Sequence, residues 1–202
     1  MGDSIIATMD TYNQMIYAIG KGPSATTVTA PDHGVPFGTP VVIKGTVLDN
    51  SPGATDSTMK LRFPNGVPAV SDESMSDWML YVYKQFAKPL NATGVEVTVN
   101  VIDSNNNYRT IGTTTSSSDG FFSLSWTPDI PGEYKVYAIF SGSDAYYGSQ
   151  AMSAFTVEDE TEPEPTTEPQ VMPPYELYII AMGIAIIIAL AIATLHILRK
   201  RQ

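Results

Sequence analysis

Residue types that carry out chemistry are few in this chain of 202 residues. It contains no cysteine, which excludes disulfides, thiolate nucleophiles and cysteine-ligated zinc. Its two histidines are His33 and His196, and His196 lies in an apolar tail, so no multi-histidine metal site or histidine-dependent triad is expected. Neither a glycine-rich phosphate loop nor a His-Glu-x-x-His motif is present. We therefore expect no catalytic residue, no metal and no cofactor, and we predict that the chain is not an enzyme.

Three short polar segments remain as candidates for chemistry. Residues 103–107 (DSNNN) offer oxygen ligands for calcium, although a turn held by Asp and Asn side chains explains them better. Residues 116–119 (SSSD) have no accompanying base, so we predict a loop rather than a nucleophile. Asn91 begins the sequon Asn91-Ala92-Thr93 and is a candidate glycosylation site.

The charge of the chain restricts its partners. There are 11 Lys and Arg against 21 Asp and Glu, which gives a formal net charge of -10. A nucleic-acid-binding protein needs a basic surface to neutralise phosphates. We therefore expect no nucleic-acid partner.

An uncharged tail indicates the lipid bilayer as a partner. Residues 177–198 contain no charged side chain. At about 1.5 Å per residue they would form a helix of roughly 33 Å, close to the ~30 Å hydrocarbon core of a membrane. Tyr175 and Tyr178 suit the interface at one end. We predict a membrane-spanning helix over residues 175–198, followed by a short basic tail, residues 199–202.

The basic tail also predicts an orientation. Basic residues tend to stay in the cytoplasm, so Arg199, Lys200 and Arg201 are expected to act as a cytoplasmic stop-transfer signal. This predicts a single-pass protein of the cell membrane with its N-terminus outside. The start, MGDSIIATMD, does not look like a signal peptide. We therefore expect either a C-terminal piece of a longer protein or a misassigned start. A tail-anchored protein with a cytoplasmic domain is the alternative, but it would place the basic tail outside.

Residues 23–157 show the alternation of apolar and polar residues that is typical of half-buried strands. Residues 95–101, 122–126 and 134–140 show it most clearly, and Asp-Gly and Pro-Gly pairs mark turns between them. About seven short strands with regular turns predict a mostly β fold, an antiparallel β-sandwich. Its core is expected to include Val97, Val99, Leu124, Trp126, Tyr134 and Val136.

Residues 71–86 break this alternation. Five apolar residues recur there at helical spacing, and Ser74 with Asp77 fits a capping box. We predict one amphipathic helix inserted between two strands. Its apolar face either covers an edge or end of the sandwich or serves as an interaction face for another domain or chain. That face consists of Met75, Trp78, Met79, Val82 and Phe86.

Two further segments flank the sandwich. Residues 158–174 are rich in Glu and Pro, which predicts a semi-rigid stalk. Residues 1–22 indicate strand, turn and strand. Because an isolated two-stranded hairpin is marginally stable in water, more sheet is expected to come from elsewhere.

Residues 132–149 (GEYKVYAIFSGSDAYYGS) resemble the last strands of bacterial-type Ig-like (Big) domains of prokaryotic surface proteins, archaeal ones among them. The shared pattern is Gly-x-Tyr-x-Val-x-Ala-x-Phe, then Gly, an acidic residue and Tyr-x-x-Ser. The resemblance covers about residues 24–157 and implies an Ig-like sandwich. Residues 50–90 depart from it, because they are longer than the usual connection of the family. Such domains serve as spacers, stalks and adhesins, and no catalytic or metal residue comes with the pattern.

Residues 14–20 (QMIYAIG) resemble a strand of PQQ-type β-propeller blades, which implies that residues 1–22 are the end of a final blade. Together these features predict a membrane-anchored extracytoplasmic module that supports or presents an N-terminal β-propeller or another surface protein. The alternative is a recognition or adhesion domain for a protein or glycan. A third possibility is the non-catalytic end of a larger secreted propeller enzyme.

Overall fold

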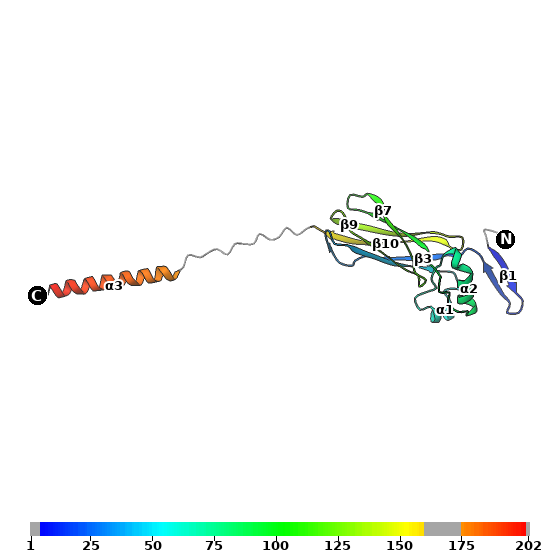
Figure 1. Ribbon diagram of the computed structural model, residues 1–202, viewed down its shortest axis with the longest axis horizontal. Coiled ribbons are helices and arrows are strands. Elements are labelled where there is room, and N and C mark those ends of the chain that lie inside the picture. The colour runs from blue at the N-terminus through cyan, green and yellow to red at the C-terminus, as the bar shows by residue number, and fades with distance from the viewer. Residues whose placement is uncertain (1–4, 160–174, 201–202) are drawn as a thin grey trace. The chain divides into compact units, whose positions relative to one another are not determined.

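The computed structural model describes residues 5–159 and 175–200 (Figure 1). The chain divides into two units, Met1–Thr161 and Glu162–Gln202. The described part of the first unit is mostly strand, and its helical segments interrupt the strands at one place in the sequence. The described part of the second unit is a single helix.

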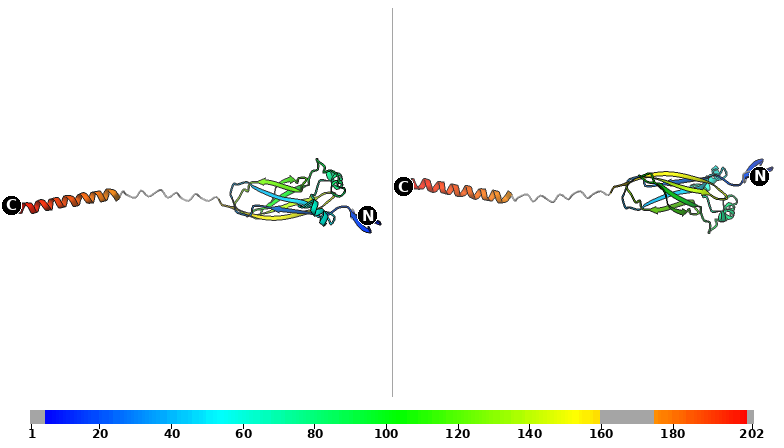
Figure 2. Two further views of the ribbon diagram at one scale, coloured as in Figure 1. Left: turned by 90° about the horizontal axis from the view of Figure 1, so that it is seen from below. Right: turned by 90° about the horizontal axis from the view of Figure 1, so that it is seen from above.

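Two sheets packed face to face form the body of the first unit (Figure 2). One sheet has the strand order β3-β5-β8 and the other β4-β10-β9-β6-β7. Neighbouring strands are antiparallel, except that β4 runs parallel to β10. This order corresponds to the two sheets of an Ig-like sandwich, so the predicted fold class is confirmed. The strands are β3 (Ser24–Thr29), β4 (Val35–Pro36), β5 (Val41–Asp49), β6 (Glu96–Ile102), β7 (Tyr108–Thr115), β8 (Phe121–Trp126), β9 (Gly132–Gly142) and β10 (Tyr147–Glu158).

The core lies between the sheets and is built from the alternating residues of the strands. In β5, Val41, Ile43 and Val47 point inward, while Val42 and Lys44 face outward. Of the six predicted core residues, four are fully buried: Val97, Val99, Tyr134 and Val136.

Two predicted core residues, Leu124 and Trp126, are only half-buried. Both belong to β8, which lies at the edge of the three-stranded sheet. One side of the Trp126 ring packs edge-on against the ring of Tyr134, and the Arg109 guanidinium lies 5.8 Å from the Trp126 ring centroid. The alternation therefore identified the inward side of β8 correctly, but the edge position limits its burial.

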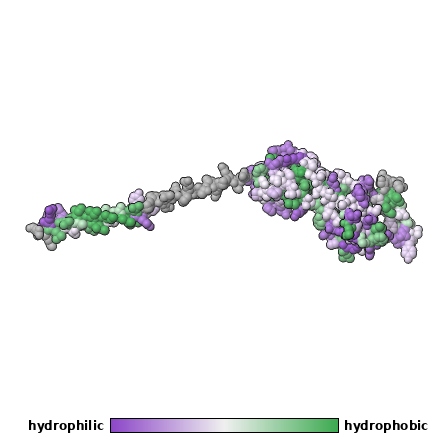
Figure 3. All heavy atoms as spheres, in the orientation of Figure 1, coloured by the Kyte–Doolittle hydropathy of each residue, from purple (hydrophilic) through white to green (hydrophobic). Residues whose placement is uncertain are grey.

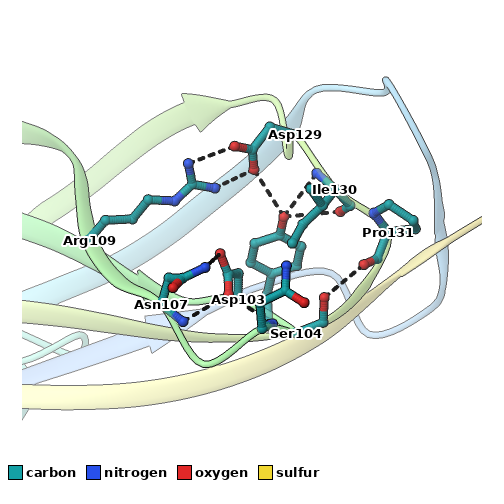
Figure 4. A network of polar contacts seen from close by, with 9 residues as sticks. Asp103, Ser104, Asn107, Arg109, Asp129, Ile130 and Pro131 are labelled. Atoms are coloured by element: carbon teal, nitrogen blue, oxygen red, sulfur yellow. Dashed lines mark hydrogen bonds and ion pairs between the residues drawn. The ribbon is translucent and has the colours of Figure 1, made fainter.

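A polar corner closes the end of the sandwich at which β10 ends (Figure 4). The Tyr134 hydroxyl donates to the carbonyl oxygen of Ile130 at 3.0 Å and accepts from the Ile130 N–H at 3.3 Å. This is the tyrosine corner typical of Ig-like sandwiches. Both guanidinium NH₂ groups of Arg109 donate to the carboxylate of Asp129, and this lowers the pKa of Asp129 to about 2.

The second unit contains the helix α3 (Tyr175–Arg199). It is 25 residues long and strongly apolar between its ends, and its length and composition are sufficient to cross a membrane. The face visible in Figure 3 is mostly hydrophobic. The predicted stalk, residues 158–174, lies outside the described residues from residue 160 onward, as does Arg201.

Candidate interaction surface

Within residues 5–159, the elements that an Ig-like fold does not need lie at one end of the sandwich. The hairpin of β1 (Ile6–Asp10) and β2 (Met15–Ile19) lies there, next to the helical insertion between β5 and β6 (Figures 1 and 2). Backbone bonds place both at this end, because Gly22 bonds to Ala145 before β10 begins and Asn50 bonds to Pro23. The chain leaves β10 at the opposite end, beside the polar corner.

The hairpin exposes apolar side chains on both of its faces. The register pairs Ile6 with Ile19 and Thr8 with Tyr17 on one face, and Met9 with Ile16 on the other. All of these side chains are exposed, and Ile16 is 74% exposed. The two strands pair with each other and with no other strand of the described part of the chain. Both strand edges and both faces are therefore free in this structure, and apolar surface is visible at this end (Figure 3).

The base of the hairpin is held to the sandwich by hydrogen bonds. The Gly22 N–H donates to the Ala145 carbonyl at 2.9 Å, and the Tyr147 N–H donates to the Gly22 carbonyl at 2.8 Å. The Ser24 hydroxyl bonds to the Tyr147 carbonyl at 2.6 Å, and the Lys21 ammonium lies 5.4 Å from the Tyr147 ring centroid. These contacts hold the hairpin at a defined point on the sandwich.

The insertion has a small core of its own. Its helix α2 (Met75–Lys84) packs against the short helix α1 (Ser57–Arg62) and the residues between them. Asp56 caps α1, because its carboxylate accepts from the Met59 N–H at 2.9 Å. Arg62 then donates from its guanidinium to the Tyr81 and Val82 carbonyls near the end of α2, where helix carbonyls lack intrahelical partners. The core residues are Ala54, Met59, Val67, Val70, Trp78 and Val82.

This packing divides the predicted interaction face. Trp78 and Val82 are each 1% exposed and belong to the core of the insertion. Met75 packs against both this core and the core of the sandwich, and Met79 is half-buried. Phe86, at 60% exposed, lies beyond the end of α2. Only the C-terminal part of the face therefore remains available to a partner in this structure.

The start of α2 differs from the predicted capping box. A 3-10 turn, η1 (Asp72–Ser74), precedes α2, and the Ser74 side chain does not cap the helix. The Ser74 hydroxyl accepts instead from the Thr93 N–H at 3.1 Å. The capping prediction was wrong because a loop distant in sequence supplies a competing donor.

Asp72 fastens the insertion to the turn between β9 and β10. Its carboxylate accepts from the backbone N–H groups of Asp144 at 2.9 Å and Ala145 at 3.1 Å. Burial raises the pKa of Asp72, but hydrogen bonding to Asp144, Ser143 and Ala145 and the charge of Lys21 outweigh it and leave the pKa below its ordinary value. The insertion is thus tied to the same turn that fixes the base of the hairpin.

The polar segments with possible chemistry are used for structure. The Asp103 carboxylate accepts from the N–H groups of Asn105 and Asn107, both at 2.9 Å, so the predicted turn held by an Asp side chain is confirmed. These bonds, the one from Asn107 most of all, lower the pKa of Asp103. The buried Ser116 hydroxyl accepts from the Val95 N–H at 2.9 Å. Within residues 5–159 and 175–200, no group of three or more His, Asp or Glu side chains is placed to hold a metal ion.

The remaining predicted site residues lie on the surface. Asn91 is exposed in the loop between α2 and β6. Arg199 ends α3, and Lys200 follows it. Sequence reasoning missed α1 and the contact of Arg62 with α2, although Asp56 before STMKLR is a helix-capping signal.

No protein-family model and no curated protein matches this chain. Among solved structures, the chain is similar to a CARDB domain of a Pyrococcus furiosus protein, in complex with di-metal ions. The TM-score is 0.32 and the identity 11%, over 69% of this chain and 96% of that domain. The Ig-like assignment therefore rests on the strand order and the tyrosine corner, and not on this similarity.

Proposed function

We propose that this chain is a non-catalytic, membrane-anchored module that holds a β-sheet domain at the hairpin end of an Ig-like sandwich. The observation that carries the proposal is the β1–β2 hairpin, whose apolar side chains are exposed on both faces. Soluble surfaces rarely tolerate apolar patches larger than a few hundred Å². An isolated two-stranded hairpin is also marginally stable in water. Both facts favour a hairpin that completes a larger assembly.

The occupant that fits best is a β-sheet module, such as the predicted N-terminal β-propeller. A sheet with apolar residues on both faces needs a layer on each side, and its free edges need strands to pair with. In β2 (Met15–Ile19), no residue is charged, which suits a position between two apolar layers. A second copy of the hairpin would cover one edge or one face and leave the other in water. The resemblance of residues 14–20 to a propeller strand supports the same occupant.

Amide exchange tests this occupant. We expect fast exchange at β1 and β2 in the isolated chain, because few contacts stabilise the hairpin, and slow exchange in the protein purified from its native membrane. The β6 amides, which are paired on both sides, serve as the internal control and should be protected in both samples. Fast exchange at the hairpin in the native protein would contradict the proposal. Protection that rises with the concentration of the isolated chain would point to a second copy instead.

We further propose that α3 spans the membrane, with residues 23–157 outside as a bacterial-type Ig-like domain. The helix has the length and the all-round apolar surface of a membrane span, and Arg199 and Lys200 at its C-terminal end favour the cytoplasmic side. The acidic, proline-rich residues 158–174 would then act as the stalk.

Fractionation and protease treatment test the anchor and its orientation. The full chain should remain with membranes after a carbonate wash, while a variant lacking residues 175–202 should become soluble, because the apolar helix is lost. Protease added to intact cells should release the sandwich by cutting within residues 158–174. A sandwich that is protected in intact cells and digested only after lysis would reverse the orientation.

The alternative, a recognition or adhesion domain, is favoured by the exposed end of α2. Leu80, Tyr83 and Phe86 are all exposed there. The burial of Trp78 and Val82, however, gives most of the apolar face an internal role. We therefore place the structural function first.

A further inference from the structure

The loop that follows α2 has a surface that the proposed function does not explain. After α2, the chain turns at Gln85, whose φ of 58° is left-handed. Phe86 and Leu90 then extend into solvent, and Leu90 is fully exposed. Asn91 follows directly and is also exposed. Two large, exposed apolar side chains thus precede the sequon Asn91-Ala92-Thr93 in the same loop.

The two functional residues of the sequon are held differently. Among the described residues, no hydrogen bond involves the side chain of Asn91, so its amide faces solvent without a structural role. Thr93, by contrast, is fixed: its hydroxyl bonds to the Ser71 hydroxyl at 2.9 Å, and its N–H donates to the Ser74 hydroxyl at 3.1 Å. Its carbonyl accepts from the Ser71 N–H at 3.0 Å. The loop therefore exposes the Asn91 amide two residues before Thr93, which is fixed to the residues that precede α2.

We propose that Asn91 carries an N-linked glycan, which covers the apolar side chains of Phe86 and Leu90. The donor is an oligosaccharide linked through phosphate to a membrane lipid. The Asn91 amide nitrogen forms a bond with the anomeric carbon of the first sugar and loses a proton. The bond between that carbon and the phosphate oxygen breaks, and the lipid-linked phosphate leaves. The proposal rests on the extracytoplasmic placement of the sandwich. An N-linked glycan is bulky and hydrated, so it suits an exposed loop such as this one.

Mass spectrometry of the full chain from the membranes of its source cells tests the proposal. Trypsin should release residues 85–109 as one peptide, because Lys84 precedes it, Arg109 ends it and Pro89 blocks cleavage after Lys88. We expect this peptide to carry added sugar mass. Asn91→Gln should remove that mass completely, while Thr93→Ser should retain it. Thr93→Ala is unsuitable, because it also removes the contacts of the Thr93 hydroxyl with the Ser71 and Ser74 hydroxyls.

Protease treatment of the same intact cells separates failure of this proposal from failure of the proposed orientation. An unmodified 85–109 peptide from cells whose sandwich is cut from outside would overturn the glycan alone. An unmodified peptide together with a sandwich protected in intact cells would overturn the glycan and the orientation. If the glycan covers the loop, Asn91→Gln should also increase binding of an apolar fluorescent dye at least twofold, and adding Phe86→Ser and Leu90→Ser should reverse this. A dye signal that Asn91→Gln leaves unchanged would overturn the covering role.

Discussion

Replacing Trp78 by alanine is expected to lower the free energy of unfolding by about 3–5 kcal/mol, as for other fully buried aromatic residues. Trp78 fills the core of the insertion, where its ring packs at 5.3 Å from that of Tyr81. Its indole N–H has no hydrogen-bond partner within the described residues, so the loss comes from packing. Urea denaturation of the full chain in detergent, followed by the β-sheet circular dichroism signal, measures the change.

Two variants serve as controls for Trp78→Ala. Trp78→Phe keeps an aromatic ring and part of the packing, so it should cost clearly less, and neither variant loses a hydrogen bond of the indole N–H. Phe86→Ala truncates an exposed residue of the same predicted face and should stay within about 0.5 kcal/mol of the wild type. If Trp78→Ala melts only the helical insertion and leaves the sandwich transition unchanged, then the contact of Met75 with both cores does not couple them.

Replacing Tyr134 by alanine should cost a similar amount, about 3–5 kcal/mol, at the opposite end of the sandwich. The buried ring stacks on Phe155 at 5.4 Å and meets Trp126 at 5.3 Å, so its removal leaves a cavity in the core at this end. The same urea titration, read from the β-sheet signal, measures this loss.

Tyr134→Phe separates the ring from the hydroxyl. It keeps the stack and removes the bonds to Ile130, so we expect a loss of about 0.5–1.5 kcal/mol. Asp129 retains its bonds from Arg109 in this variant, which limits the cost. Equal losses for Tyr134→Ala and Tyr134→Phe would show that the corner, and not the ring packing, stabilises this end.

The sandwich was predictable because a strand that is buried on one face alternates apolar and polar residues in its own sequence. Residues 122–126 and 134–140, where the alternation is clearest, lie within β8 and β9. The two-residue strand β4 (Val35–Pro36) could not be predicted in this way, since one buried residue shows no alternation. The insertion helix was also predictable, but the residues that cover it were not. Met59 lies in the six-residue helix α1, which is too short to show a clear period, and Val67 lies in the loop after it, so only the structure shows that Trp78 is covered from within the chain.

Errors arose where distant segments compete for the same atoms. The Ser74 hydroxyl serves Thr93 rather than its own helix, and a sequence pattern cannot show that such a donor is near. The hairpin illustrates the opposite case. Its strands follow from the sequence and are present, but nothing in their own contacts identifies what covers them.

The parallel contacts of β10 determine how this domain would respond to a mechanical load. At the start of β10, Tyr146 bridges Gly22 in parallel, and at its end Val157 and Glu158 pair in parallel with β4. A pull between Gly22 and Glu158 therefore acts along the strands and stretches these hydrogen bonds in shear. Bonds loaded in this way must yield together, whereas bonds pulled perpendicular to the strands open one after another. A tension applied to the sandwich between its two ends would therefore be resisted by hydrogen bonds in shear.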